Sequence, residues 1–537
     1  MRRAIVPLLA AIALAAGCGR ARPGVVLVTI DSLRADEVTA VIRGQAVAPR
    51  LAAFAGESVV FDHAVSGAPW TTPAMAGILT GMLPPAHGLE EHHRAIAGPV
   101  AVLTERFKAA GYRTAAIVPS PTLRPEYGFG RGFDSYDFEN YGHSRLSSPS
   151  MIGKALHWLD GQKDERFFLW IHLWDPHYNY IPPPPYDTMF RDGQRPERED
   201  VQCLKWVENA VSPAEAVYFR GQYRGEIAYT DRYLGDLLDA LAARRFGDKV
   251  VVAVLADHGE SFQEHGWLGH TNRVDETLLH VPLMIRWTGQ LAPAHVSRRV
   301  STASLGRTLL ELTGLDDRPF GLEPALPVPG SPAVTSPLAS EPRVLAETVR
   351  QGCFTSRTVP RLKYVLDQRN CRESLFDLES DPDERHDLAT ERPDTVLLHR
   401  GDLVKELERL RAANVPKAAL PPEIVEQAES ALRSLGYRPR PRAGKAALAD
   451  PGIRRIGRLM AASVVGLSAT QRPLDEVARF LGGAARSPEP SAPPVPEPEA
   501  WSPRRARRAA RPNCAVATTR GIVDGTLEDP PGPRDGG

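Results

Sequence analysis

The chain has 537 residues, in which 65 lysines and arginines balance 65 aspartates and glutamates and 42% of residues are apolar. This length permits a large buried core, and the zero net charge excludes a general electrostatic attraction to nucleic acid or to a membrane surface. Five cysteines, none in a Cys-x-x-Cys spacing, exclude a disulfide-rich scaffold and a cysteine-based zinc site.

The first eighteen residues have the pattern of a bacterial lipoprotein signal. Arg2 and Arg3 precede an apolar run over residues 4–16, and small residues lead to Cys18. The run is too short to cross a bilayer as a mature helix. Residues 1–18 therefore predict export to the cell envelope and a membrane anchor through lipidated Cys18, with simple cleavage or an uncleaved anchor as the alternatives.

Apolar, strand-like runs alternate with helical segments through residues 24–325. The runs are GVVLVTID, TAAIVP, FFLWIHLW, KVVVAVLAD and VPLMIRW. They are continuously apolar, as is typical of strands whose two faces are both buried. The alternation predicts one α/β domain with a mostly parallel central sheet flanked by helices, which binds ligands beyond the carboxyl ends of its strands.

A proline- and serine-rich stretch ends this alternation, and residues 340–437 predict a small α+β subdomain. It contains the strand-like runs VLAETV and RLKYVLD and a charged helix over residues 394–412. A hairpin of the two runs would bring Cys353 and Cys371 together, so a disulfide and two free thiols are both open.

Residues 438–485 predict a linker with a short helix, and residues 486–537 predict a disordered tail. The tail is rich in proline, glutamate and arginine, and it has too few apolar residues to offset the entropy of the chain. Its basic cluster, residues 504–511, is interpreted as a solvated run, and no nucleic-acid partner is expected.

Two strand-like runs end in acidic residues at the predicted ligand-binding edge. GVVLVTID ends at Asp31, and KVVVAVLAD ends at Asp257, which His258 follows directly. Each aspartate alone is explained equally well as the cap of a turn. Two carboxylates and an imidazole together are a ligand set for a divalent cation.

The segment APWTTPAMAGILTG predicts a helix with Thr72 at the N-cap, Pro73 at the first helical position and Gly81 as the stop. Thr71 or Thr72 is then a simple cap. The same position places a hydroxyl beside unpaired N–H groups and the positive end of a helix dipole, where a transferring phosphoryl or sulfuryl group is stabilised. Capping and catalysis are equally supported by this segment.

Three histidines lie in segments that follow strand ends. His177 is in WDPHYNY, and His265 and His270 are in ESFQEHGWLGH. Loops at strand ends are where such side chains reach a substrate, although a single histidine is more often structural.

Read together, these segments resemble the sulfatase branch of the alkaline-phosphatase superfamily over about residues 25–388. The resemblance rests on six motifs in order: VVLVTIDSLRAD, APWTTPAMAGILTGMLPPAHG, FKAAGYRTAAIV with GFGRGFDSYD, WDPHYNYIPP, LADHGESFQEHGWLGH and LFDLESDPDERHDLA. It implies an alkaline-phosphatase-like sandwich with a small C-terminal subdomain.

The resemblance also implies roles for individual residues. Asp31, Asp257, His258 and Thr71 would bind a divalent cation, either Ca, Mg, Mn or Zn. Thr71 would be the nucleophile, and His177 and His270 would contact the anionic substrate or its leaving group. His87, in LPPAHG, is interpreted as structural.

Three departures from the sulfatase pattern bear on the reaction. Thr71 stands where sulfatases have the Cys or Ser that becomes formylglycine, and residues 73–75 replace the Pro-x-Arg pattern, so formylglycine is not expected. Ser32 replaces the second acidic residue of the first motif, and the Lys-x-His pair after GYRTA is absent. The anion site must therefore be built from other residues.

The resulting hypothesis is a metal-dependent hydrolase of sulfate, phosphate or phosphonate esters with Thr71 as the nucleophile. Phosphorus is favoured, because a sulfated threonine would have to be attacked at sulfur, whereas threonine suits phosphoryl transfer. The alternatives are a phosphotransferase of the same superfamily acting on envelope lipids or glycans, and an inactive substrate-binding lipoprotein.

Overall fold

The computed structural model describes residues 22–91, 94–141, 145–164, 166–205, 207–244, 246–315, 318–331, 344–348, 354–368, 370–413, 415 and 418–434. The predicted signal with Cys18, the linker at 438–485 and the tail at 486–537 lie outside these residues. Within the described ranges, no helix combines the length and the apolar character needed to cross a membrane.

The main sheet has eight strands in the order β15-β4-β14-β10-β1-β9-β7-β8. The five strands from β10 to β8 are mutually parallel, and β14 runs antiparallel to both of its neighbours. The prediction of a mostly parallel sheet is confirmed. The strands are β1 (Gly24–Ile30), β4 (Val59–Phe61), β7 (Arg113–Val118), β8 (Ser135–Phe138), β9 (Phe167–Leu173), β10 (Val250–Ala256), β14 (Leu283–Arg286) and β15 (Ala294–Val296).

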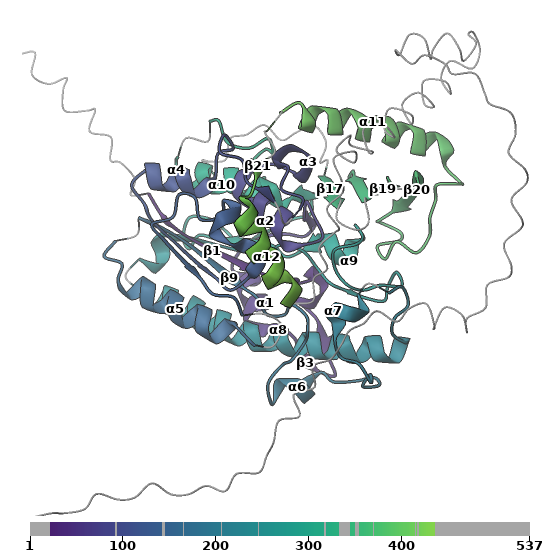
Figure 1. Ribbon diagram of the computed structural model, residues 1–537. Helices are drawn as coiled ribbons and strands as arrows, with labels where there is room; N and C mark the ends of the chain where they lie inside the picture. Colours follow the sequence, from purple (N-terminus) through teal and green to yellow (C-terminus); the bar gives the residue numbers. More distant parts are fainter. Residues whose placement is uncertain are drawn as a thin grey trace, which may run out of the picture. The chain divides into compact units, whose positions relative to one another are not determined.

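Helices cover both faces of this sheet (Figure 1), with α4 and α10 on one side and α5 and α8 on the other. Every residue of β1, β9 and β10 is consequently buried, which explains their continuously apolar sequences. The helices of the chain before residue 315 are α1 (Pro49–Gly56), α2 (Thr71–Thr80), α3 (Pro84–His87), α4 (Leu103–Ala109), α5 (Ser148–Asp160), α6 (Tyr186–Met189), α7 (Val201–Leu204), α8 (Pro213–Ala242), α9 (Glu276–Leu279) and α10 (Leu305–Leu312).

Short strands join the loops around the main sheet. They are β2 (Val41–Ile42) with β3 (Gln45–Ala46), β11 (Ser261–Phe262) with β12 (Leu268–Gly269), β5 (Ala64–Val65) between β13 (His280–Val281) and β16 (Val300–Ser301), and β6 (Arg94–Ala95) with β21 (Ala418–Ala419). The β11-β12 pair belongs to the glycine-containing loop that follows β10.

Helix α2 is buried along its whole length and ends at Gly81, as predicted. Gly81 has a φ of +65°, and a Cβ there would lie 2.9 Å from a ring carbon of Phe320 and 3.1 Å from the Cα of Gly321. Only glycine accepts both this backbone conformation and this contact. The packing at Gly81 therefore helps to fix the helix whose first residue is Thr71.

A second sheet has four antiparallel strands in the order β17-β18-β19-β20. The strands are β17 (Val344–Thr348), β18 (Phe354–Thr358), β19 (Leu362–Asp367) and β20 (Arg372–Asp377), and the helices beyond them are α11 (Pro393–Arg411) and α12 (Pro422–Ser434). Helix α11 contacts β19 and β20. The sheet joins the main body where the Glu347 N–H donates to the Gly67 carbonyl at 3.0 Å.

The predicted hairpin between VLAETV and RLKYVLD is wrong. β18 lies between β17 and β19 and pairs with both, so the two runs are not neighbours. β18 has the sequence FTSRT, one apolar residue followed by four polar ones, so no apolar run marks it. Cys371 is a free cysteine, and Cys353 lies outside the described residues.

Glu323 is a buried carboxyl beside α11. Burial raises its pKa to about 7, although Arg409, 3.9 Å away, acts to lower it. The folded protein therefore holds a proton that the unfolded chain releases above about pH 4.5, and the free energy of unfolding falls as pH rises toward 7.

We expect Glu323→Gln to remove this loss of stability. Relative to wild type, the variant should gain on the order of 2–3 kcal/mol between about pH 5 and pH 8, measured by urea unfolding at both values. If the free energy of unfolding changed equally in the two proteins across that range, Glu323 would ionise in the folded state at its ordinary pKa.

Candidate functional site

The carboxylates of Asp31 and Asp257 meet at the carboxyl edge of the main sheet. β1 and β10 are parallel and in register, with Ile30 opposite Ala256, so the next residue of each strand brings one carboxylate beside the other. Both side chains are fully buried. Asp257 Oδ1 accepts the backbone N–H groups of Ser32 at 3.2 Å and His258 at 2.8 Å.

The Thr71 hydroxyl points at Asp31 and at the His258 ring. Thr71 Oγ1 lies 3.3 Å from Asp31 Oδ2, to which it donates, and 3.4 Å from His258 Nε2. The predicted helix start is wrong by two residues: α2 begins at Thr71 with extended Trp70 at the N-cap. Thr72 Oγ1 donates to the Thr122 carbonyl at 2.9 Å. Neither threonine hydroxyl is therefore the cap of its own helix.

His258 is held with its Nε2 toward the carboxylates. Its Nδ1 lies 2.9 Å from the Gly259 carbonyl, which can only accept, so the proton is on Nδ1 and Nε2 carries a lone pair. That Nε2 lies 3.5 Å from Asp31 Oδ1 and 3.6 Å from Asp257 Oδ2. The four residues predicted as metal ligands thus form one cluster.

The rings of His177 and His270 lie beside this cluster. The His270 ring centre is 4.3 Å from that of His258 and 5.0 Å from that of His177. His270 Nδ1 is 3.0 Å from Glu260 Oε1, and His177 stacks on Trp174 with centres 4.0 Å apart. Both histidines predicted to contact the substrate are buried beside the side chains that surround the Thr71 hydroxyl.

Two other histidines of the predicted motifs lie outside the cluster. His265 groups with Asp275 and Glu384, which are already paired with Arg273 and Lys363. His87 Nδ1 accepts the Leu89 N–H at 3.0 Å, in keeping with a structural role.

The charges of the cluster favour a bound cation. Burial, and after it the negative charge of Asp31, raises the pKa of Asp257 to about 6. Burial also acts to raise the pKa of Asp31, but the neighbouring imidazoles, His177 first, hold it well below its ordinary value. Two buried carboxylates placed this close together are stabilised by a metal ion.

The spacing of donor atoms also fits a divalent cation. Two ligands each ~2.1 Å from a tetrahedral ion lie ~3.4 Å apart, and the contacts among Asp31, Thr71 and His258 are 3.3–3.5 Å. Asp257 Oδ2 is buried and has no hydrogen-bond partner among the described residues. The residues present therefore match the requirements of a metal ion.

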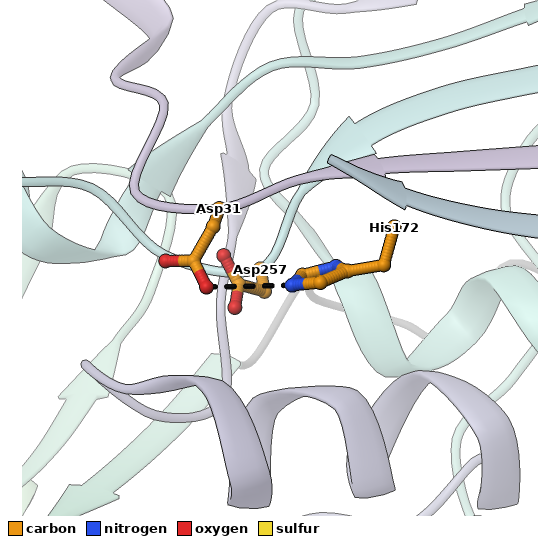
Figure 2. A group of neighbouring side chains, drawn as sticks. All are labelled: Asp31, His172 and Asp257. Atoms are coloured by element: carbon orange, nitrogen blue, oxygen red, sulfur yellow. Dashed lines mark ion pairs between the residues drawn. The ribbon is translucent and has the colours of Figure 1, made fainter. Parts of the chain in front are cut away.

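Sequence reasoning missed three buried residues near the cluster. His172, on β9, faces Asp31 and groups with both aspartates (Figure 2). Glu260 holds His270, and Lys205 donates to the Tyr178 hydroxyl and lies 4.3 Å from the centre of its ring. His172 had a signal, because it lies two residues before the carboxyl end of the predicted strand FFLWIHLW. Lys205 had none, because it follows the short helix α7 far along the chain.

Comparisons with known proteins agree with the geometry. The profile of the family described as Sulfatase matches residues 23–315. Choline-sulfatase of Rhizobium meliloti (strain 1021) is 24% identical over 439 residues, covering 68% of this chain and 82% of that protein. Arylsulfatase K of Mus musculus is 28% identical over 201 residues, so the chain spans only 35% of that relative's length.

Solved structures show the same fold. The phosphonate monoester hydrolase of Agrobacterium radiobacter matches with a TM-score of 0.59 at 20% identity, covering 74% of this chain and 97% of that chain. The fold is accordingly the alkaline-phosphatase-like sandwich, with a mostly parallel central sheet and a separate antiparallel sheet toward the C-terminus.

Proposed function

Because this chain belongs to the sulfatase family, we propose that it hydrolyses anionic esters with Thr71 as the nucleophile. The observation that carries the proposal is the convergence of Thr71 Oγ1 on Asp31 at 3.3 Å and on His258 at 3.4 Å, from three separate segments of the chain. A threonine serving only as a helix cap has no reason to point at a buried acid and an imidazole.

Each group of the cluster has its own role in the proposed two-step displacement. A divalent cation bound there would lower the pKa of the Thr71 hydroxyl and offset negative charge on the ester. Asp31 Oδ2 accepts the hydroxyl's hydrogen bond and so turns a lone pair of Oγ1 toward the substrate. Oγ1 passes its proton to Asp31 Oδ2 and bonds to the phosphorus or sulfur atom as the alcohol oxygen leaves. Water then attacks the same atom and releases Thr71.

His270 is the proposed acid for the leaving oxygen. Its Nδ1 is held by the carboxylate of Glu260, which orients the ring and stabilises the protonated imidazole. His177 Nδ1 is instead held by the backbone carbonyl of Tyr178 at 2.7 Å. We assign His177 to contact with the anionic group.

We expect His270→Ala to affect esters according to their leaving group. The ratio kcat/KM should fall ~10²-fold or more for a phenyl ester, whose leaving oxygen needs a proton, and far less for a p-nitrophenyl ester. His265→Ala, in the same loop but outside the cluster, is the control. Equal losses on both esters would exclude His270 as the acid.

Phosphate and phosphonate esters are the proposed substrates. A threonine hydroxyl readily attacks the phosphorus of an ester and displaces its alcohol. Formylglycine, which suits sulfate release, requires a cysteine or serine at this position. The solved structures of similar fold include phosphonate monoester hydrolases, which supports the proposal.

A panel of chromogenic esters tests the reaction. Purified protein is incubated with p-nitrophenyl sulfate, p-nitrophenyl phosphate, bis-p-nitrophenyl phosphate and p-nitrophenyl phenylphosphonate under Mn²⁺, Zn²⁺, Mg²⁺ or Ca²⁺. The highest kcat/KM is expected with a phosphorus ester. A preference for sulfate would reverse the substrate assignment, and absence of turnover with every metal would favour an inactive binding protein.

The proposal includes a location in the cell envelope. It is supported by the basic, apolar and small-residue pattern of residues 1–18, which ends at Cys18. A lipid on Cys18 would hold the enzyme at a membrane, where anionic esters of lipids or glycans are available.

A further inference from the structure

His172 is a fully buried histidine whose outer ring nitrogen faces the carboxylate cluster. It lies on β9 opposite Thr29 of β1, two residues before Asp31. Its Nε2 is 3.4 Å from Asp31 Oδ2 but lacks the geometry of a hydrogen bond, and it has no such partner among the described residues. Figure 2 shows this nitrogen pointing at Asp31, with Asp257 alongside.

The other ring nitrogen of His172 is held from behind. Its Nδ1 lies 2.8 Å from Thr29 Oγ1, which also accepts the indole N–H of Trp170 at 2.9 Å. The Thr29 hydroxyl is in reach of the Ile171 carbonyl at 3.5 Å, so its second lone pair can accept the Nδ1 proton. This arrangement fixes the ring and leaves a lone pair on Nε2, as is usual for histidines that bind metals.

Ser32 does not supply the donor that the sulfatase pattern has at its position. Its hydroxyl donates to Asp31 Oδ1 at 2.8 Å, so it orients that carboxylate. His172 approaches Asp31 by the other oxygen, Oδ2, which is also the oxygen that Thr71 contacts. One donor atom from each of Asp31, His172 and Asp257 lies within 4.8 Å of the others.

We propose that His172 is an additional metal ligand of this site, supplied by β9 in place of the acidic side chain that Ser32 lacks. The inference rests on the proposed metal-dependent function, but it holds whether the ester contains phosphorus or sulfur. With His172 and His258 the site has two imidazoles and two carboxylates. Such a set selects Zn²⁺ or Mn²⁺ over Ca²⁺, which prefers oxygen donors alone.

Metal binding measured directly tests the inference. Zn²⁺, Mn²⁺ and Ca²⁺ are titrated calorimetrically into metal-free wild type, His172→Gln and His399→Gln, the last changing a buried histidine of α11. Gln can keep a hydrogen bond to Asp31 but is a poor ligand, so His172→Gln should weaken Zn²⁺ binding ~10²-fold or more, which exceeds the usual cost of losing an outer partner of a ligand. His399→Gln should bind as wild type does.

X-ray absorption of the zinc-loaded protein counts the imidazoles. We expect two histidines in wild type and one in His172→Gln. If His172→Gln does not fold, the number of histidine ligands in wild type is sufficient. A single histidine on the zinc of wild type would overturn the inference. Unchanged affinity in His172→Gln would also overturn it while leaving the proposed function standing, whereas a wild type that binds no cation would end both.

Discussion

Thr71→Ala should abolish ester turnover while leaving the fold and the three other predicted metal ligands intact, so that the variant still binds a cation. The variant loses the only proposed nucleophile, and removing the nucleophile of a covalent mechanism costs on the order of 10⁴-fold or more in kcat. The stability cost should be small, because the lost contacts at 3.3 and 3.4 Å are long for hydrogen bonds to a hydroxyl. Steady-state kinetics and the thermal shift produced by Mn²⁺ or Zn²⁺ report the two properties separately.

The neighbouring threonine is a matched control for this variant. Thr72 is equally buried, but its hydroxyl donates to the Thr122 carbonyl, away from the cluster. Thr72→Ala should therefore lose about 1–2 kcal/mol of stability and keep most of its activity. Thr71→Ser should retain measurable turnover, because it keeps the hydroxyl. Full activity in Thr71→Ala would exclude the covalent mechanism.

The main sheet and the acids at its edge could be predicted because both depend on patterns of a few neighbouring residues. Continuous apolar runs mark strands buried on two faces, and parallel strands bring their carboxyl ends to one edge. Asp31 and Asp257 follow two such runs directly, so both are expected at this edge. Their meeting also requires β1 and β10 to be neighbours in register, which local sequence does not show.

The position of His172 depends on strand pairing as well as on local sequence. His172 reads as one polar residue within an apolar strand, and only its pairing opposite Thr29 reveals that it faces Asp31. The start of α2 was misplaced because Thr72-Pro73 imitates an N-cap sequence, while the backbone stays extended only through Trp70. In the second sheet, β18 was missed because most of its residues are polar. They are buried because β18 pairs with a strand on each side, which the local sequence does not reveal.

Asp31→Asn should lose both the metal and the activity, which separates it from Thr71→Ala. The amide keeps the shape of the carboxyl and can still accept from the Ser32 hydroxyl, but it removes the negative charge that Thr71, His172 and His258 surround.

In wild type, a cation at about one hundred times its Kd stabilises the fold by ~2.7 kcal/mol. That gain should vanish in Asp31→Asn, and turnover should fall at least as far as in Thr71→Ala. Asp36→Asn is the control, since Asp36 follows the same strand but pairs with Arg34 at 2.8 Å. A metal-induced thermal shift of wild-type size in Asp31→Asn would show that the cation binds elsewhere. That result would exclude the role assigned to the cluster.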